Sequence, residues 1–170
     1  MAPISWDRRS YEATVLLVPL DPTARGWLLR QDPAALEGIT VAEADLLPSH
    51  DRLRPEPVPA SGEGTAVSSP LDHAVHDADV VVLLAHELTA VDGRSVVAVG
   101  DAARATGTLL GAVVVSPGAR WAEPAAHHAA TTIREAADNV VILKDSRFAL
   151  PFLQVLRGGA RDAEPAGSMR

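Results

Sequence analysis

The sequence is 170 residues long, with 47% hydrophobic and 22% charged residues, a net charge of −7 at pH 7 and no cysteine. The length suits one globular domain, the acidic balance argues against nucleic acid or an anionic membrane as a partner, and the lack of cysteine excludes disulfides, thiolate metal ligands and a thiol nucleophile. No apolar run reaches the length of a signal peptide or of a membrane span, so we expect a cytoplasmic protein.

Composition divides the chain into three parts. Residues 1–11 form a polar lead, residues 12–158 carry the hydrophobic patterns of a single α/β domain, and residues 159–170 are a tail that we predict to be disordered. Inside the domain, four prolines and two glycines between residues 48 and 69 predict a long excursion. Such an excursion is either mobile or functional, and its composition favours the first interpretation.

The first half of the domain predicts two strands around a short helix. Ala13 to Leu20 is a continuous apolar run, typical of a central parallel strand that is buried on both faces. Asp21-Pro22 is a helix start signal, so a helix is predicted from Thr23 to about Gln31. Gly38 to Leu46 alternates apolar and polar residues, which predicts a strand nearer the edge of the sheet.

The second half alternates helices with apolar runs. One helix begins near Ser69-Pro70, and another spans Arg94 to Thr106 and is expected to end at Gly107 in a left-handed conformation. This alternation predicts an α/β fold, a three-layer Rossmann-like parallel sheet with right-handed crossovers. The remaining predicted segments are the strands Val80 to Ala85, Leu109 to Val115 and Val140 to Lys144, and the helices Pro124 to Asn139 and Phe148 to Leu156.

Three stretches of the second half resemble the nucleotide-binding domain of the FtsZ and tubulin family. They are HDADVVVLLA (76–85), TGTLLGAVVV (106–115) and TTIREAADNVVILKDSRF (131–148). In that family an Ala-Asp-apolar strand leads into a glycine-rich loop, a helix that ends in glycine, an apolar strand, and a helix followed by a further apolar strand. The interval from Asp79 to Gly107 fits the family's spacing without a gap. The resemblance implies an FtsZ/tubulin GTPase-domain-like fold.

The sequence differs from the family at the segments with which the family binds phosphate. The family's signature Gly-Gly-Gly-Thr-Gly-Thr-Gly falls on residues 88–94, which read LTAVDGR. Side chains such as Leu88 and Val91 obstruct the approach of backbone amides to a triphosphate, and Asp92 repels it. The family's first glycine-rich turn falls on DPTARG and keeps only Gly26, and the second domain has no counterpart in this sequence. We therefore expect a shortened relative with a degenerate nucleotide site and no cofactor.

One weak site survives this comparison. Gly93, Arg94 and Ser95 stand at the start of a predicted helix, where amides and a guanidinium can bind an anion. An ordinary helix cap by Asp92 is the favoured alternative.

No catalytic or metal site is predicted. His86 and Glu87 follow the carboxyl end of a strand and could form an acid/base pair, but no nucleophile is identifiable beside them. His73 and His76, with aspartates nearby, could hold a divalent ion, although a solvated helix face fits them better. His127-His128 point about 100° apart on a helix and cannot readily share one ion.

Two functions fit these observations. The preferred one is a non-enzymatic protein-interaction or regulatory module, with self-association or a protein partner, because a scaffold without its phosphate cradle keeps the faces through which its relatives associate. Contact is expected through the helix Pro124 to Asn139 and the segment Phe148 to Leu156, unless that segment simply covers the domain's own sheet. The alternative is a small-molecule-binding protein or enzyme that uses a crevice formed by residues 21–25, 86–95 and 116–120.

Overall fold

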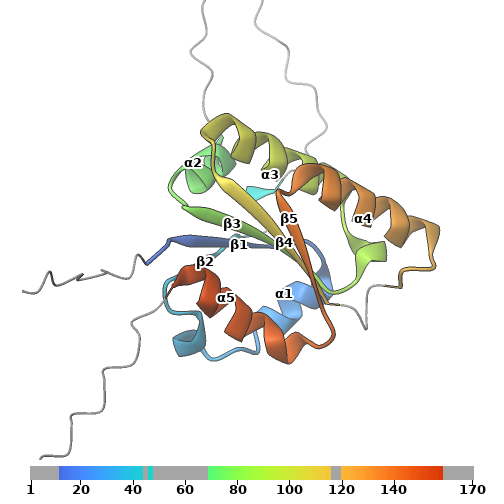
Figure 1. The fold of residues 1–170 in the computed structure, drawn as a ribbon, viewed down its shortest axis with the longest axis horizontal. Coiled ribbons are helices and arrows are strands. Elements are labelled where there is room, and N and C mark those ends of the chain that lie inside the picture. Colours follow the sequence, from blue (N-terminus) through green and yellow to red (C-terminus); the bar gives the residue numbers. More distant parts are fainter. Residues whose placement is uncertain (1–11, 44–45, 48–68, 116–119, 159–170) are drawn as a thin grey trace, which may run out of the picture.

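Strands and helices alternate along the chain and form three layers. The computed structural model describes residues 12–43, 46–47, 69–115 and 120–158. Five strands form one sheet in the order β2-β1-β3-β4-β5, and every neighbouring pair is parallel. Figure 1 shows α2, α3 and α4 on one face of the sheet and α1 and α5 on the other. The predicted α/β class with a parallel, Rossmann-like sheet is thus confirmed.

The elements follow the predicted order. The strands are β1 (Val15–Pro19), β2 (Ile39–Val41), β3 (Val80–Ala85), β4 (Leu109–Val115) and β5 (Asn139–Leu143). The helices are α1 (Pro22–Leu28), α2 (Pro70–His76), α3 (Gly93–Thr106), α4 (Pro124–Ala136) and α5 (Ala149–Arg157). Single turns of 3₁₀ helix occur at Pro33–Leu36, Leu88–Ala90 and Ser146–Phe148.

Three predicted boundaries need correction. The helix expected from Thr23 to about Gln31 is α1, which already ends at Leu28. The strand expected over Gly38 to Leu46 is only β2. Leu17 pairs with Val41 as the last pair of the ladder, and Pro19 is the next residue of β1 that would donate to β2, but proline has no N–H. The helix expected to end at residue 139 ends at Ala136. There the backbone N–H of Asp138 donates to the carbonyl of Leu110, which turns the chain into β5. The lead 1–11, the tail 159–170 and nearly all of the excursion 48–69 lie outside the described residues.

Helix ends follow local chemistry. The Ser69 hydroxyl accepts a hydrogen bond from the Asp72 N–H, and the Asp72 carboxylate accepts one from the Ser69 N–H, so the two residues form a capping box at the start of α2. Gly107 ends α3 with φ of 73°, as predicted, and its N–H donates to the carbonyl of Ala103. These caps fix where the helices begin and end over the sheet.

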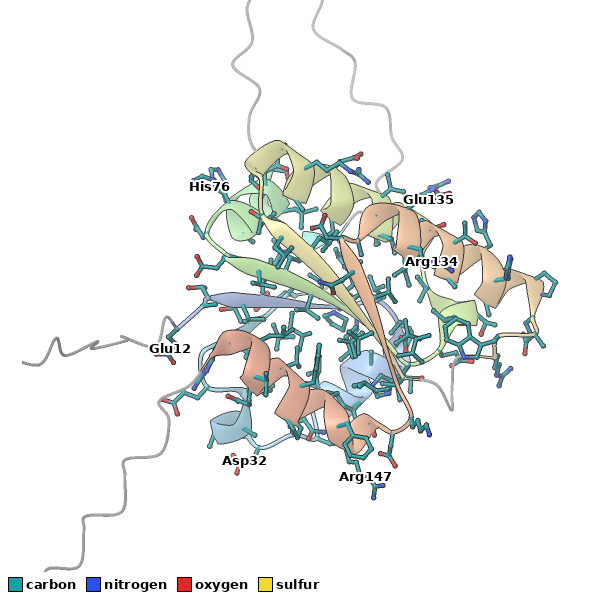
Figure 2. The ribbon with its side chains drawn as sticks, in the orientation of Figure 1. Glu12, Asp32, His76, Arg134, Glu135 and Arg147 are labelled. Carbon is teal, nitrogen blue, oxygen red and sulfur yellow. The ribbon has the colours of Figure 1, made fainter. Side chains whose placement is uncertain are left out.

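The core lies on both faces of the sheet. Along β3, Val81 and Leu83 pack toward α2, α3 and α4, whereas Val82 and Leu84 pack toward α1 and α5. The six side chains labelled in Figure 2 lie at the periphery of the molecule: Glu12, Asp32, His76, Arg134, Glu135 and Arg147. No helix among the described residues has the length and apolar character that a membrane span requires.

The C-terminal helix α5 covers the sheet face opposite α4. Leu153 is fully buried in that core, and Phe152 and Leu156 pack partly buried against it. Phe148 and Val155 stay exposed. Covering the domain's own sheet is therefore one role of this segment, and its role in self-association stays a prediction.

Candidate functional site

A cleft of about 500 Å³ lies at the carboxyl ends of the central strands. The sheet order reverses between β1 and β3, because the chain passes from β1 outward to β2 on one side and from β3 outward to β4 on the other. Doubly wound sheets bind ligands outside the carboxyl ends of the strands at such a point. The side chains lining the cleft come from four connections: Thr23, His86, Glu87, Val115, Arg120, Asp145 and Ser146.

Asp21 links the connection between β1 and α1 to the connection between β3 and α3. Its side chain is 1% exposed. One carboxylate oxygen accepts a hydrogen bond from the Ala24 N–H at 2.9 Å, and the other accepts one from the His86 N–H at 2.7 Å. The same carboxylate therefore caps α1 and holds the chain that leaves β3.

His86 is the one residue of the cleft wall with an unpaired buried side-chain nitrogen. The residue is 7% exposed, and its Nε2 atom has no hydrogen-bond partner. Its ring lies 5.3 Å from the ring of Trp27, measured between centroids. Burial lowers the pKa of His86 below 6.5; Asp21 opposes that shift, and Arg30 adds to it. The imidazole is therefore neutral near pH 7.

This burial predicts that stability falls in mild acid. The unfolded chain binds a proton at His86 near pH 6.5, but the folded chain does so only at lower pH. Stability is thus fully present above pH 6.5 and declines as the pH falls toward the folded pKa. The free energy of unfolding, measured by urea denaturation, should differ less between about pH 7.5 and about pH 5.5 in His86→Gln than in the wild type. In the exposed-histidine control His76→Gln, the wild-type difference should persist, and an equal loss in both variants would contradict the assignment.

Glu87 is held in the cleft by three weak contacts. Its two carboxylate oxygens accept hydrogen bonds from the hydroxyls of Thr23 at 3.4 Å and Thr89 at 3.3 Å. The Arg120 guanidinium lies 3.9 Å from Glu87 and 3.4 Å from Glu123. These contacts are long, so the Glu87 carboxylate is loosely held and available to a ligand.

The far wall comes from the connection between β5 and α5. Asp145 accepts a hydrogen bond from the Arg147 N–H at 2.9 Å and lies 3.7 Å from the Arg147 guanidinium. Ser146 follows it and also lines the cleft. The sequence-based crevice did not include Asp145 and Ser146, although they follow the carboxyl end of a predicted strand and the same rule would have found them.

The predicted anion site lies elsewhere, in the first turn of α3. The Asp92 carboxylate accepts hydrogen bonds from the Arg94 N–H at 3.1 Å and from the Ser95 hydroxyl at 3.2 Å. Gly93 faces Thr132 of α4. None of Gly93, Arg94 and Ser95 lines the cleft. Asp92 thus acts as the cap of α3, and anion binding at these three residues stays a prediction.

The other candidate histidines lie on exposed helix surfaces. His73 and His76 are exposed on α2, and His127 and His128 are exposed on α4. Within the part of the chain that the structure describes, no three histidine, aspartate or glutamate side chains gather into a possible metal site.

No family model matches the sequence, and no curated protein matches it.

Proposed function

We propose that this chain is an FtsZ/tubulin-like domain with a degenerate nucleotide site that acts without catalysis as a protein-interaction or regulatory module. The observation that carries the proposal is the loop between β3 and α3. Leu88 is fully buried there in the core beneath α2, α3 and α4, within a turn of 3₁₀ helix. A loop anchored by a buried leucine does not wrap its backbone around phosphates.

Hydrogen bonding supports the same conclusion. A phosphate-binding helix start needs unpaired backbone N–H groups that point at the anion. In α3 the Arg94 N–H already donates to the Asp92 side chain, and the Ser95 N–H donates to the Asp92 carbonyl. An incoming phosphate would have to displace this carboxylate and overcome its negative charge.

The segments that carry the family resemblance support the proposed relationship. The stretch 76–85 runs into β3, the stretch 106–115 contains β4, and the stretch 131–148 contains the end of α4, β5 and the following turn. Each lies on an element of the type that the resemblance implies. On this proposal, the chain keeps the family's packed strands and helices, and the buried Leu88 and the Asp92 cap stand in place of its phosphate contacts.

Calorimetry with GTP and Mg²⁺ tests the proposal. We expect no binding tighter than about 10 μM, equivalent to roughly −7 kcal/mol, because Leu88 anchors the loop in the core and the Asp92 carboxylate already accepts the Arg94 N–H. Weak binding of inorganic phosphate that disappears in Arg94→Ala would locate the residual anion site at α3. Tight GTP binding by the wild type would contradict the proposal.

The cleft favours a second candidate function, the binding of a small polar molecule. Glu87 and Asp145 contribute two carboxylates and Arg120 one guanidinium, so the cleft carries net negative charge and suits a ligand with an amine better than a nucleotide. The same calorimeter titrated with putrescine distinguishes the two candidates. Heat of binding that is lost in Glu87→Gln favours the cleft, and its absence favours the interaction module.

A further inference from the structure

The strand β5 forms an open edge of the sheet. It pairs with β4 on one side only and lies between α4 and α5, as Figure 1 shows. Edge strands present unpaired N–H and C=O groups, and proteins usually protect them by shortness, proline or charged residues. The opposite edge, β2, is only three residues long. In contrast, β5 has five residues, NVVIL, with no proline and no charge.

The surface beside this edge is hollowed, and it combines exposed apolar side chains with Arg134, which borders both hollows. Ile142 is 57% exposed, and Trp121 is exposed nearby. A hollow of about 360 Å³ borders Val140 and Ile142, and a second of about 190 Å³ lies between Ile142, Trp121 and α4. A neighbouring strand that lay along β5 would place its own side chains over these hollows.

The sequence of β5 is complementary to itself in one register. When two copies of β5 run antiparallel with Val141 at the centre, Val140 lies opposite Ile142, and Asp138 lies opposite Lys144. Val140 and Ile142 point to the same face of the strand, because side chains alternate. Asp138 and Lys144 flank the strand at its two ends, and one Asp138 carboxylate oxygen accepts the Leu110 N–H of β4, which leaves the other oxygen for Lys144 of the second copy. Opposite charges and apolar side chains that face each other across two strands both stabilise a sheet. Lys144 is the only lysine of the sequence.

We propose that the partner at this edge is a second copy of the chain, paired through β5 around a twofold axis to make one continuous sheet. The inference rests on the proposed interaction function and names its partner and surface. A twofold contact uses the same patch on both copies, which is the commonest symmetry of soluble oligomers. The pairing covers both copies of Ile142 and brings two Asp138–Lys144 pairs together at the ends of the interface.

Sedimentation equilibrium of the full chain tests the proposed dimer. We expect a concentration-dependent species of twice the 17.8 kDa chain mass. Ile142→Lys should remain monomeric at all concentrations, because it places two charges opposite apolar partners at the interface. Val97→Lys is the matched control: Val97 is 48% exposed on α3, away from β5, and this variant should dimerise like the wild type. Circular dichroism establishes that both variants are folded.

The charge pair provides an independent test that leaves the apolar surface intact. Lys144→Glu should raise the dissociation constant at least about tenfold, because each end then carries two facing carboxylates. Asp138→Asn should weaken the dimer less, since it removes one attraction without creating a repulsion. Its amide oxygen can still accept the hydrogen bond that the Leu110 N–H donates at 2.9 Å, so the fold of each chain is preserved. A carbodiimide that joins amines to carboxylates should link Lys144 of one copy to Asp138 of the other, identifiable by mass spectrometry.

A wild-type chain that sediments as a monomer would overturn the inference, as would a dimer that persists in both Ile142→Lys and Lys144→Glu. Neither result bears on the proposed loss of nucleotide binding, because GTP calorimetry alone tests that proposal. Conversely, tight GTP binding would overturn the proposed function whatever the oligomeric state. The two failures are therefore distinguishable.

Discussion

Replacing Asp21 by alanine is expected to lower the free energy of unfolding by about 3 kcal/mol, the sum of a lost helix cap and an unpaired buried N–H. The carboxylate is the acceptor both for Ala24 at the start of α1 and for His86 at the end of β3. Because Asp21 is almost fully buried, water cannot replace these bonds. Urea denaturation at neutral pH measures the loss.

Asp32→Ala is the matched control for this effect. Asp32 is also an aspartate that precedes a proline, and its carboxylate accepts a hydrogen bond from the Ala34 N–H at 2.9 Å. However, Asp32 is exposed and has only this local bond, so its loss should cost less than about 1 kcal/mol. Equal losses in the two variants would show that Asp21 acts only as a helix cap and does not hold β3.

The central strands were the most predictable part of the fold. Val80 to Ala85 and Leu109 to Val115 were predicted with the boundaries that β3 and β4 have. Both strands have neighbours on each side and helices on each face, so almost every position is buried and the sequence is continuously apolar. The edge strand β2 was overestimated, because its end depends on a proline in β1 that is distant in sequence.

The cleft was less predictable than the sheet, because its walls come from four separate connections. The Asp21-Pro22 pair correctly indicated the start of α1, but no local pattern reveals that the same carboxylate accepts the N–H of His86. Asp145 and Ser146 reach the cleft only because β5 lies beside β4. Local propensity decides helices and strands, whereas long-range packing decides which side chains meet.

The strand order itself does not select a function. The order β2-β1-β3-β4-β5 occurs in doubly wound folds with different ligands, and the residues in their loops decide the chemistry. For this chain the decisive loop connects β3 to α3. It forms a turn of 3₁₀ helix and is built around the buried side chain of Leu88.

Leu88→Ala is therefore expected to lower the free energy of unfolding by about 3 kcal/mol, through lost burial and the cavity left behind. Leu29→Ala removes the same atoms from a side chain that is 87% exposed on the far side of the sheet, so its effect should stay within about 0.5 kcal/mol. Urea denaturation of both variants provides the comparison, and the slope of the free energy of unfolding against urea concentration should be the same in both. Similar small losses in both would mean that the loop is not anchored by Leu88. A loop without this anchor can rearrange around an anion, which would contradict the proposed loss of nucleotide binding.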